Sequence, residues 1–161
     1  MGYLNPVMQY GFEKFCREAK NVGVDGIILP DLPIYEFETE YKKILRENEL
    51  DFIFLITPET SEERIKKIDE LTTGFIYAVS SSSTTGKDTN LSLRQNYFQK
   101  LQQLKLRNPV LVGFGIKDKQ TFNFACEFAN GAIIGSAFIK ALQNSTDINA
   151  ATETFLNKIL K

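Results

Sequence analysis

Five short apolar runs alternate with helical segments along the chain, and this order constrains the fold more than any other feature of the sequence. The runs show no alternation of apolar and polar residues, so both faces of each strand are expected to be buried. Strands of this kind form parallel sheets that are covered by helices. The expected strands cover residues 26–30, 51–57, 74–80, 109–113 and 131–135.

Helical spacing of apolar residues separates these strands, and Ser61 is a plausible N-cap for the segment that follows it. The residues before 11 are expected to form a loop. Helices are expected over residues 11–22, 36–48, 61–71, 91–106, 117–129, 136–142 and 147–160.

Two architectures fit this order of elements in a chain of 161 residues. A five-stranded doubly wound domain would be complete at this length, whereas a (β/α)8 barrel needs about 250 residues and eight strands. The chain opens with a loop and a helix, and a complete doubly wound domain would be expected to open with a strand. The sequence therefore predicts one domain, residues 1–161, with elements missing upstream.

Glycines at the ends of the last two strands are the strongest local signal of a site. Gly113 and Gly115 flank Phe114 after one strand, and Gly135 with Ser136 follows the next strand at the start of a short helix. Bare N–H groups at a helix N-terminus attract anions, and barrels bind phosphate after strands seven and eight. We therefore expect a phosphate site here, which would number the visible strands four to eight. The alternative is that these glycines only permit tight turns.

Three further features follow strands or lie inside them. The run SSSSTTGKDT, residues 80–89, is interpreted as a mobile lid over the strand ends, with a solvated linker as the alternative. Asp31 directly follows an apolar run, where a carboxylate could do acid–base work or anchor a loop. Tyr77 could offer its phenol to a pocket or pack in the core.

Composition excludes several classes of function. The sequence has no histidine, which rules out His-based metal sites, Ser-His triads and imidazole proton shuttles. The 19 basic and 20 acidic residues give a net charge of -1 without a basic stripe, so nucleic acid is an unexpected partner. Without a signal peptide or a long apolar run, a cytoplasmic protein is expected. Cys16 and Cys126 are both expected to fill the core in a reduced compartment.

Six stretches in one order, MGYLNPV, VGVDGIILPDLP, FIFLITPET, FIYAVSSSSTTG, LVGFGI and GAIIGSA, resemble the tryptophan synthase alpha chain family. The resemblance covers the whole sequence. It implies a (β/α)8 TIM barrel, of which this chain supplies strands four to eight with their helices. It also implies a lyase of tryptophan biosynthesis that cleaves indole-3-glycerol phosphate to indole and glyceraldehyde 3-phosphate by a retro-aldol reaction.

The resemblance assigns roles to individual residues. Thr85 matches a lid threonine and Tyr77 is a supporting candidate in catalysis, while Asn5 and Pro33 match positions that face the beta chain. The positions that hold the substrate phosphate through backbone amides are Gly86, Gly115, Gly135 and Ser136. The positions that line the indole pocket are Ile28, Pro30, Leu55, Tyr77 and Phe114.

The family's catalytic glutamate and aspartate have no counterpart in this sequence, because they belong to the part of the family that precedes it. The polypeptide by itself is therefore expected to be inactive. The resemblance implies no metal and no cofactor, since pyridoxal phosphate belongs to the beta chain, the partner in an alpha2beta2 complex. The alternatives are another phosphate-binding barrel enzyme and a non-catalytic phosphate-binding remnant.

Overall fold

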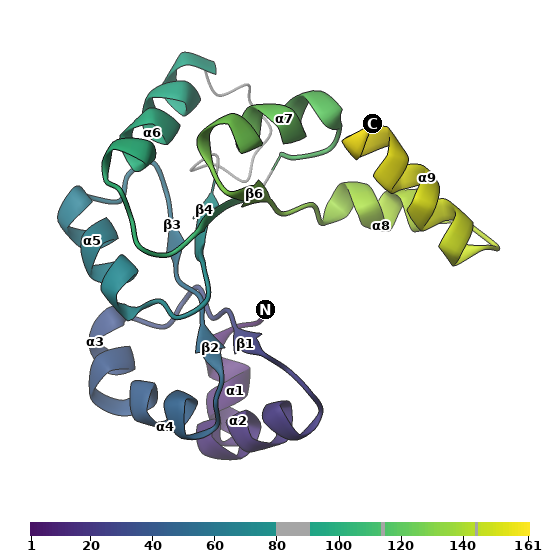
Figure 1. Ribbon diagram of the computed structural model, residues 1–161. Helices are drawn as coiled ribbons and strands as arrows, with labels where there is room; N and C mark the ends of the chain where they lie inside the picture. Colours follow the sequence, from purple (N-terminus) through teal and green to yellow (C-terminus); the bar gives the residue numbers. More distant parts are fainter. Residues whose placement is uncertain (80–90, 114, 144) are drawn as a thin grey trace.

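Short parallel strands follow one another around an arc, and helices α5, α6 and α7 lie along the outer side of that arc (Figure 1). The computed structural model describes residues 1–79, 91–113, 115–143 and 145–161, with the backbone alone for residues 91–95. Within these ranges the strands are β1 (Gly26–Ile27), β2 (Asp51–Phe52), β3 (Leu55–Ile56), β4 (Ile76–Val79), β5 (Val110–Gly113) and β6 (Gly131–Ala132).

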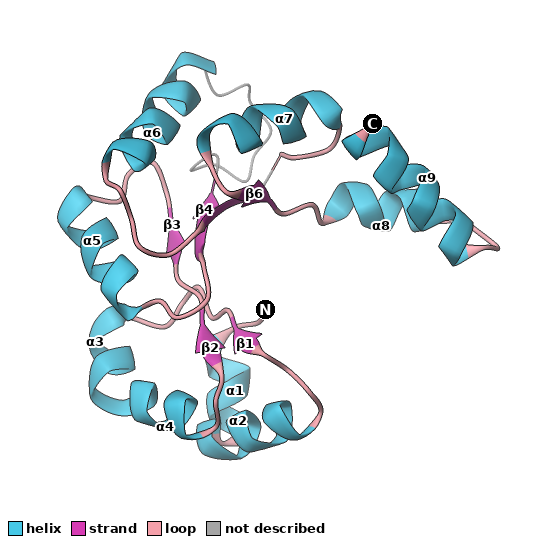
Figure 2. Ribbon diagram, viewed as in Figure 1, coloured by secondary structure: helices cyan, strands magenta, loops and turns pink. Residues whose placement is uncertain are grey.

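Helices connect these strands, as Figure 2 shows. In the described part of the chain they are α1 (Leu4–Tyr10), α2 (Phe12–Asn21), α3 (Ile34–Glu36), the π-helical turn η1 (Phe37–Tyr41), α4 (Lys42–Glu47), α5 (Glu62–Leu71), α6 (Leu91–Gln103), α7 (Lys119–Phe128), α8 (Ser136–Leu142) and α9 (Ile148–Leu160). None of the helices in these ranges is both long and apolar enough to cross a membrane.

The expected strand over residues 51–57 is in fact two strands. β2 pairs with β1, whereas β3 pairs with β4 in the sheet β3-β4-β5-β6, and all pairs are parallel. The change of neighbour occurs between Ile53, whose N–H donates to Ile27 O at 3.0 Å, and Phe54, whose carbonyl accepts from Tyr77 N at 2.9 Å. The segment therefore bonds one neighbour with its first residues and the other neighbour with its last residues.

The expected opening loop is also wrong, because residues 4–10 form helix α1. Pro6 lies in the first turn, where its missing N–H removes no bond inside the helix. Both carboxylate oxygens of Asp31 accept from the N–H of Leu4, at 2.9 and 3.0 Å. A cap supplied 27 residues away cannot be read from the local sequence. By contrast, the N-cap at Ser61 is confirmed, since its hydroxyl accepts from Arg64 N at 3.3 Å.

Aromatic rings fill the core on the helical side of the strands. Phe37, Phe52 and Phe54 lie with ring centroids 4.7–4.9 Å apart. Cys16 is fully buried, as expected, and burial raises the pKa of its thiol to about 11. Cys126 was expected in the core too, but it is exposed because it lies on the outward side of α7, next to the buried Ala125.

Asp69 is a buried carboxylate that fastens the end of α5 to the start of β5. It accepts from the backbone N–H groups of Arg107 and Asn108, both at 2.9 Å, and from the Asn108 side chain at 3.0 Å. Burial acts to raise the pKa of Asp69, but these hydrogen bonds outweigh it and hold the pKa below its ordinary value. The carboxylate therefore fixes the turn that leads into β5.

Asp69→Asn should lower the free energy of unfolding by about 1–3 kcal/mol at neutral pH, because the amide turns an N–H toward two backbone donors. Because the folded pKa is lowered, this stabilisation is present above the ordinary aspartate value of about 3.9. It is lost as the pH falls through the folded pKa. Urea unfolding of parent and variant across this range measures the difference. Glu70→Gln, at the exposed neighbouring position, is the control and should change stability by less than about 0.5 kcal/mol.

Candidate functional site

The loops that follow the strands meet at one edge of the sheet, because all the strand pairs are parallel. This edge carries Asp31 after β1, a turn at Thr57–Thr60 after β3, Gly115 after β5 and Gly135 after β6. Sites in parallel α/β folds are built at this edge. The residues expected from the sequence to form the site therefore belong to the appropriate end of the strands.

The side chain of Tyr77 packs directly against the backbone of Gly113. Tyr77 is in β4 and 7% exposed, and Gly113 pairs with Val79, two residues further along the same strand. Any side chain at Gly113 would overlap the phenol ring of Tyr77. Burial raises the pKa of the Tyr77 phenol, so it stays protonated at neutral pH. The bare backbone at Gly113, interpreted from sequence as an opening for phosphate, makes room for this ring.

The other two strand-end glycines differ from Gly113 and from each other. Gly115 has φ 78°, a left-handed conformation that favours glycine. Gly135 is the N-cap of α8 with φ −107°, and a Cβ built on it would meet no atom within 4 Å. Neither packing nor backbone strain therefore requires glycine at Gly135. Ser136 begins α8 and is exposed, so N–H groups of the first helical turn lie beside open space.

The residues expected to line an indole pocket come from two places. Leu55 in β3 is the pairing partner of Tyr77, so these two side chains are neighbours across the sheet. Ile28 and Pro30 follow β1, and Ile28 is tied to the N-terminus through its carbonyl, which accepts from Gly2 N at 3.0 Å. The remaining expected site residues, Phe114, Thr85 and Gly86, lie outside the described residues, as does the expected lid over residues 80–89.

Asp31 anchors a loop, which was the alternative to the acid–base role considered for it from the sequence. Its bonds to Leu4 N join the loop after β1 to the start of α1. They also bring Asn5, the next residue of α1, toward the segment that contains Pro33, and both residues are exposed. The two positions expected to face a beta chain thus belong to two segments that one carboxylate holds together.

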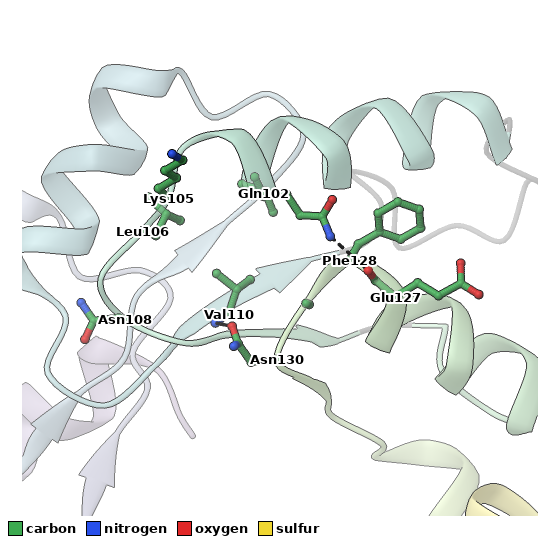
Figure 3. Close-up of a pocket in the computed structure, with 10 residues that line it drawn as sticks. Gln102, Lys105, Leu106, Asn108, Val110, Glu127, Phe128 and Asn130 are labelled. Carbon is green, nitrogen blue, oxygen red and sulfur yellow. Dashed lines mark hydrogen bonds between the residues drawn. The ribbon is translucent and has the colours of Figure 1, made fainter.

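A hollow lies at the amino-terminal ends of the strands, and it was not expected from the sequence. Figure 3 shows it between the ends of α6 and α7, with a volume of about 410 Å³. Gln102 Nε2 donates to Glu127 O at 3.0 Å, and Val110 N donates to Asn130 Oδ1 at 2.8 Å. The first bond joins α6 to α7, and the second joins the start of β5 to the residue before β6. The hollow lies at the beginning of β5, away from the strand ends that carry Gly115 and Gly135.

Groups of three or more Cys, Asp or Glu side chains that could hold a metal ion do not occur among the residues that the structure describes. Among the described residues, the groups at the strand ends include N–H groups at the start of a helix, a buried phenol and apolar side chains. Such a set can grip an anion and accommodate a flat apolar ring.

The family model for the tryptophan synthase alpha chain matches residues 1–160. The chain belongs to the tryptophan synthase alpha chain family. It is 52% identical over 163 residues to a tryptophan synthase alpha chain of Phocaeicola vulgatus, covering 100% of this chain and 62% of that protein. It is 51% identical over 148 residues to the one of Bacteroides thetaiotaomicron, covering 91% and 58%. The chain thus spans about three fifths of the length of these relatives.

Solved structures of this family share the fold. The tryptophan synthase A-subunit of Pyrococcus furiosus is 36% identical with a TM-score of 0.78, over 98% of this chain and 62% of that one. A chain of the Pyrococcus furiosus tryptophan synthase a2b2 complex is also 36% identical, with a TM-score of 0.75. The chain therefore forms strands four to eight of a TIM barrel, with β1 as strand four, β2 and β3 together as strand five, and β6 as strand eight.

Gly113→Ala should lower the free energy of unfolding by about 1–3 kcal/mol, because its methyl group would enter the space of the Tyr77 ring. In a Tyr77→Ala background the same substitution should cost close to nothing. A double-mutant cycle by chemical denaturation measures this coupling. Gly135→Ala, whose methyl would meet no neighbour, is the control for adding a Cβ. Equal costs in both backgrounds would rule out the packing role of Gly113.

Asp31→Ala should lower the free energy of unfolding by about 0.5–2 kcal/mol, because Leu4 N at the start of α1 loses its acceptor. Asp31→Asn keeps one acceptor oxygen and should cost less. Thermal and urea unfolding followed by circular dichroism compare the three proteins. An alanine variant as stable as the parent would show that this cap contributes nothing to the fold.

Proposed function

We propose that this chain forms the substrate-binding part of a tryptophan synthase alpha subunit, a lyase acting on indole-3-glycerol phosphate. In the proposed retro-aldol reaction, the bond between the indole ring and the glycerol chain breaks. The ring carbon takes up the bonding electrons and a proton, while the hydroxyl group on the adjacent glycerol carbon loses its proton, so that this carbon becomes the aldehyde of glyceraldehyde 3-phosphate. Membership of the family supports this assignment.

The observation that carries the proposal is the open space at Gly135 beside the first turn of α8. In this role the backbone amides of Gly86, Gly115, Gly135 and Ser136 hold the phosphate. The positive end of the helix dipole and its N–H groups favour a dianion at this position. Gly115, which lies two residues after the end of β5 with a left-handed backbone of φ 78°, is proposed to offer its N–H to the same phosphate.

The indole ring would lie against Leu55, Tyr77 and Phe114, with Ile28 and Pro30 completing the wall. Leu55 and Tyr77 already adjoin across the sheet. The protonated phenol of Tyr77 and the hydroxyl of Thr85 are supporting groups in this scheme. A pocket that is mostly apolar with a few polar groups suits a flat bicyclic ring.

Proton transfer in this scheme depends on a glutamate and an aspartate that the family resemblance places before the matched region. Asp31 does not replace them, because both of its oxygens bond Leu4 N. We therefore propose that the 161-residue chain alone binds substrate without turning it over. The missing acid–base groups would cost about 10²–10⁴-fold in rate.

The proposed partner is a tryptophan synthase beta chain, in which pyridoxal phosphate is bound. The supporting finding is that a structural relative is part of an a2b2 complex. Asn5 and Pro33 are the proposed contacts on this chain, and Tyr35, two residues after Pro33, is exposed. No metal or organic cofactor enters the proposed reaction of the alpha subunit.

Gly135→Asp should weaken binding of indole-3-glycerol phosphate at least about 10-fold, because a carboxylate would enter the open space beside the phosphate. Gly135→Lys should preserve or tighten binding, and Gly135→Ala should leave it nearly unchanged. Isothermal titration calorimetry measures affinity, and thermal unfolding checks that stability is equal. The phosphate site is wrong if the Asp and Lys variants bind alike. Indole release by the chain alone at the rate of a full-length relative would overturn the expected inactivity.

A further inference from the structure

Helices α8 and α9 leave a hollow between them that does not belong to the site at the strand ends. It has a volume of about 570 Å³. Its walls come from α8, from α9 with the turn before it, and from Lys117 in the segment between β5 and α7. Gly115, Gly135 and Ser136 are not among the residues that line it. A volume of this size is typical of sites for small molecules.

Small side chains explain why the two helices do not close this space. Helices α8 and α9 lie side by side (Figure 1), and the rings of Phe138 and Phe155 join them at a centroid distance of 5.3 Å. The lining residues are spaced as on one face of each helix, at positions 137, 140 and 141 of α8 and at positions 147, 150, 151, 154, 155 and 158 of α9 with its N-cap. Four of these residues are alanines, which are too short to fill the gap between the helices.

Three lysines line the hollow, and each comes from a different element. Lys117 precedes α7, Lys140 lies on α8 and Lys158 lies near the end of α9. With the residues that the structure describes, the three ammonium groups make no hydrogen bond and no ion pair. By contrast, the ammonium groups of Lys20 and Lys67 lie 3.2 and 2.7 Å from glutamate carboxylates.

Two carboxylates near these lysines are held in helix caps. Asp147 Oδ1 accepts from Ala150 N at 2.9 Å, and Asp118 Oδ1 accepts from the N–H and the hydroxyl of Thr121 at 2.8 and 2.7 Å. The bonds from Thr121 hold the pKa of Asp118 below its ordinary value, and the positive charges of two of the three lysines act in the same direction. Of the two carboxylates only that of Asp147 lines the hollow, so three ammonium groups leave a surplus of positive charge there.

We propose that this hollow binds a small molecule that carries two or more negative charges, such as a diphosphate. The three ammonium groups take its charged oxygens, because contacts between ammonium and phosphate groups are charge-assisted hydrogen bonds. The hydroxyls of Thr146 and Thr154, which also line the hollow, are further donors. The bound anion would join α8, α9 and the segment before α7. This inference does not rest on the proposed reaction, because it uses none of the residues assigned to that reaction.

The shape of the site favours a small molecule over an extended polyanion. Nucleic acids and anionic membranes are bound by a basic stripe or face of a protein. Here the three lysines lie around one hollow, and the carboxylates of Asp118 and Asp147 lie among them. The chain as a whole has a net charge of -1.

The test uses pyrophosphate as the ligand and the isotopically labelled 161-residue chain at low ionic strength. In nuclear magnetic resonance spectra, the backbone amide signals of residues 146, 150 and 151 should shift together, because these residues line the hollow. Isothermal titration calorimetry gives the affinity. Lys140→Gln and Lys158→Gln should each weaken binding at least about 5-fold, because each removes a charge-assisted contact. Lys66→Gln removes the same charge from an exposed position of α5 and should leave the affinity unchanged.

Gly135→Asp separates this site from the proposed substrate site. The variant should bind indole-3-glycerol phosphate more weakly, yet pyrophosphate should still shift the signals of residues 146, 150 and 151, because Gly135 does not line the hollow. Lys158→Gln should show the opposite pattern. Pyrophosphate binding at the hollow of a chain that does not bind indole-3-glycerol phosphate would support this inference and contradict the proposed function alone.

Four results would overturn the proposal. The first is the absence of any shift at millimolar pyrophosphate while the chain is folded by circular dichroism. The second is a set of shifts confined to Gly115 and Ser136, which would place the anion at the strand ends. The third is pyrophosphate binding that Lys66→Gln weakens as much as Lys140→Gln and Lys158→Gln do. The fourth is tighter binding of a DNA oligonucleotide than of pyrophosphate at the same residues, which would identify an extended polyanion as the ligand.

Discussion

The bonds of residues 51–56 to two different neighbours hold the arc together. The N–H of Ile53 donates to Ile27 O on one side, and the carbonyl of the next residue, Phe54, accepts from Tyr77 N on the other. Without this change of partner, the parallel pair β1 and β2 would share no backbone hydrogen bonds with the four-stranded sheet through this segment. The rings of Phe37, Phe52 and Phe54 pack against one another. The side chains of this segment therefore help to hold the arc together, as its backbone does.

The positions of most helices and strands could be predicted from the sequence, because periodic apolar residues reflect burial directly. What could not be predicted depends on contacts between distant segments. Helix α1 is capped by Asp31 from another loop, and the division of residues 51–57 follows from pairing with two different neighbours. Cys126 lies beside a buried alanine but on the other side of its helix, and a single apolar residue does not specify which side it occupies.

The candidate site shows the same limit at the level of single glycines. The three strand-end glycines look alike in the sequence, yet the structure requires glycine at only two of them, for two different reasons. Gly113 makes room for the Tyr77 ring, Gly115 adopts a left-handed backbone, and a Cβ at Gly135 would meet no atom within 4 Å. A ring from the adjacent strand leaves no trace in the sequence around Gly113. The glycine pattern thus located the strand ends. It did not distinguish a glycine that makes room for a packed side chain from one that could make room for a ligand.

The different accessibility of the two thiols can be used to measure local unfolding of the N-terminal region. Cys126 is exposed on α7, whereas Cys16 is fully enclosed between α2 and its neighbours. An alkylating reagent would therefore modify Cys126 in the native chain and reach Cys16 only when α2 separates from the core. The delay between the two modifications would report how often α2 separates from the core. No cysteine would have to be introduced for this measurement.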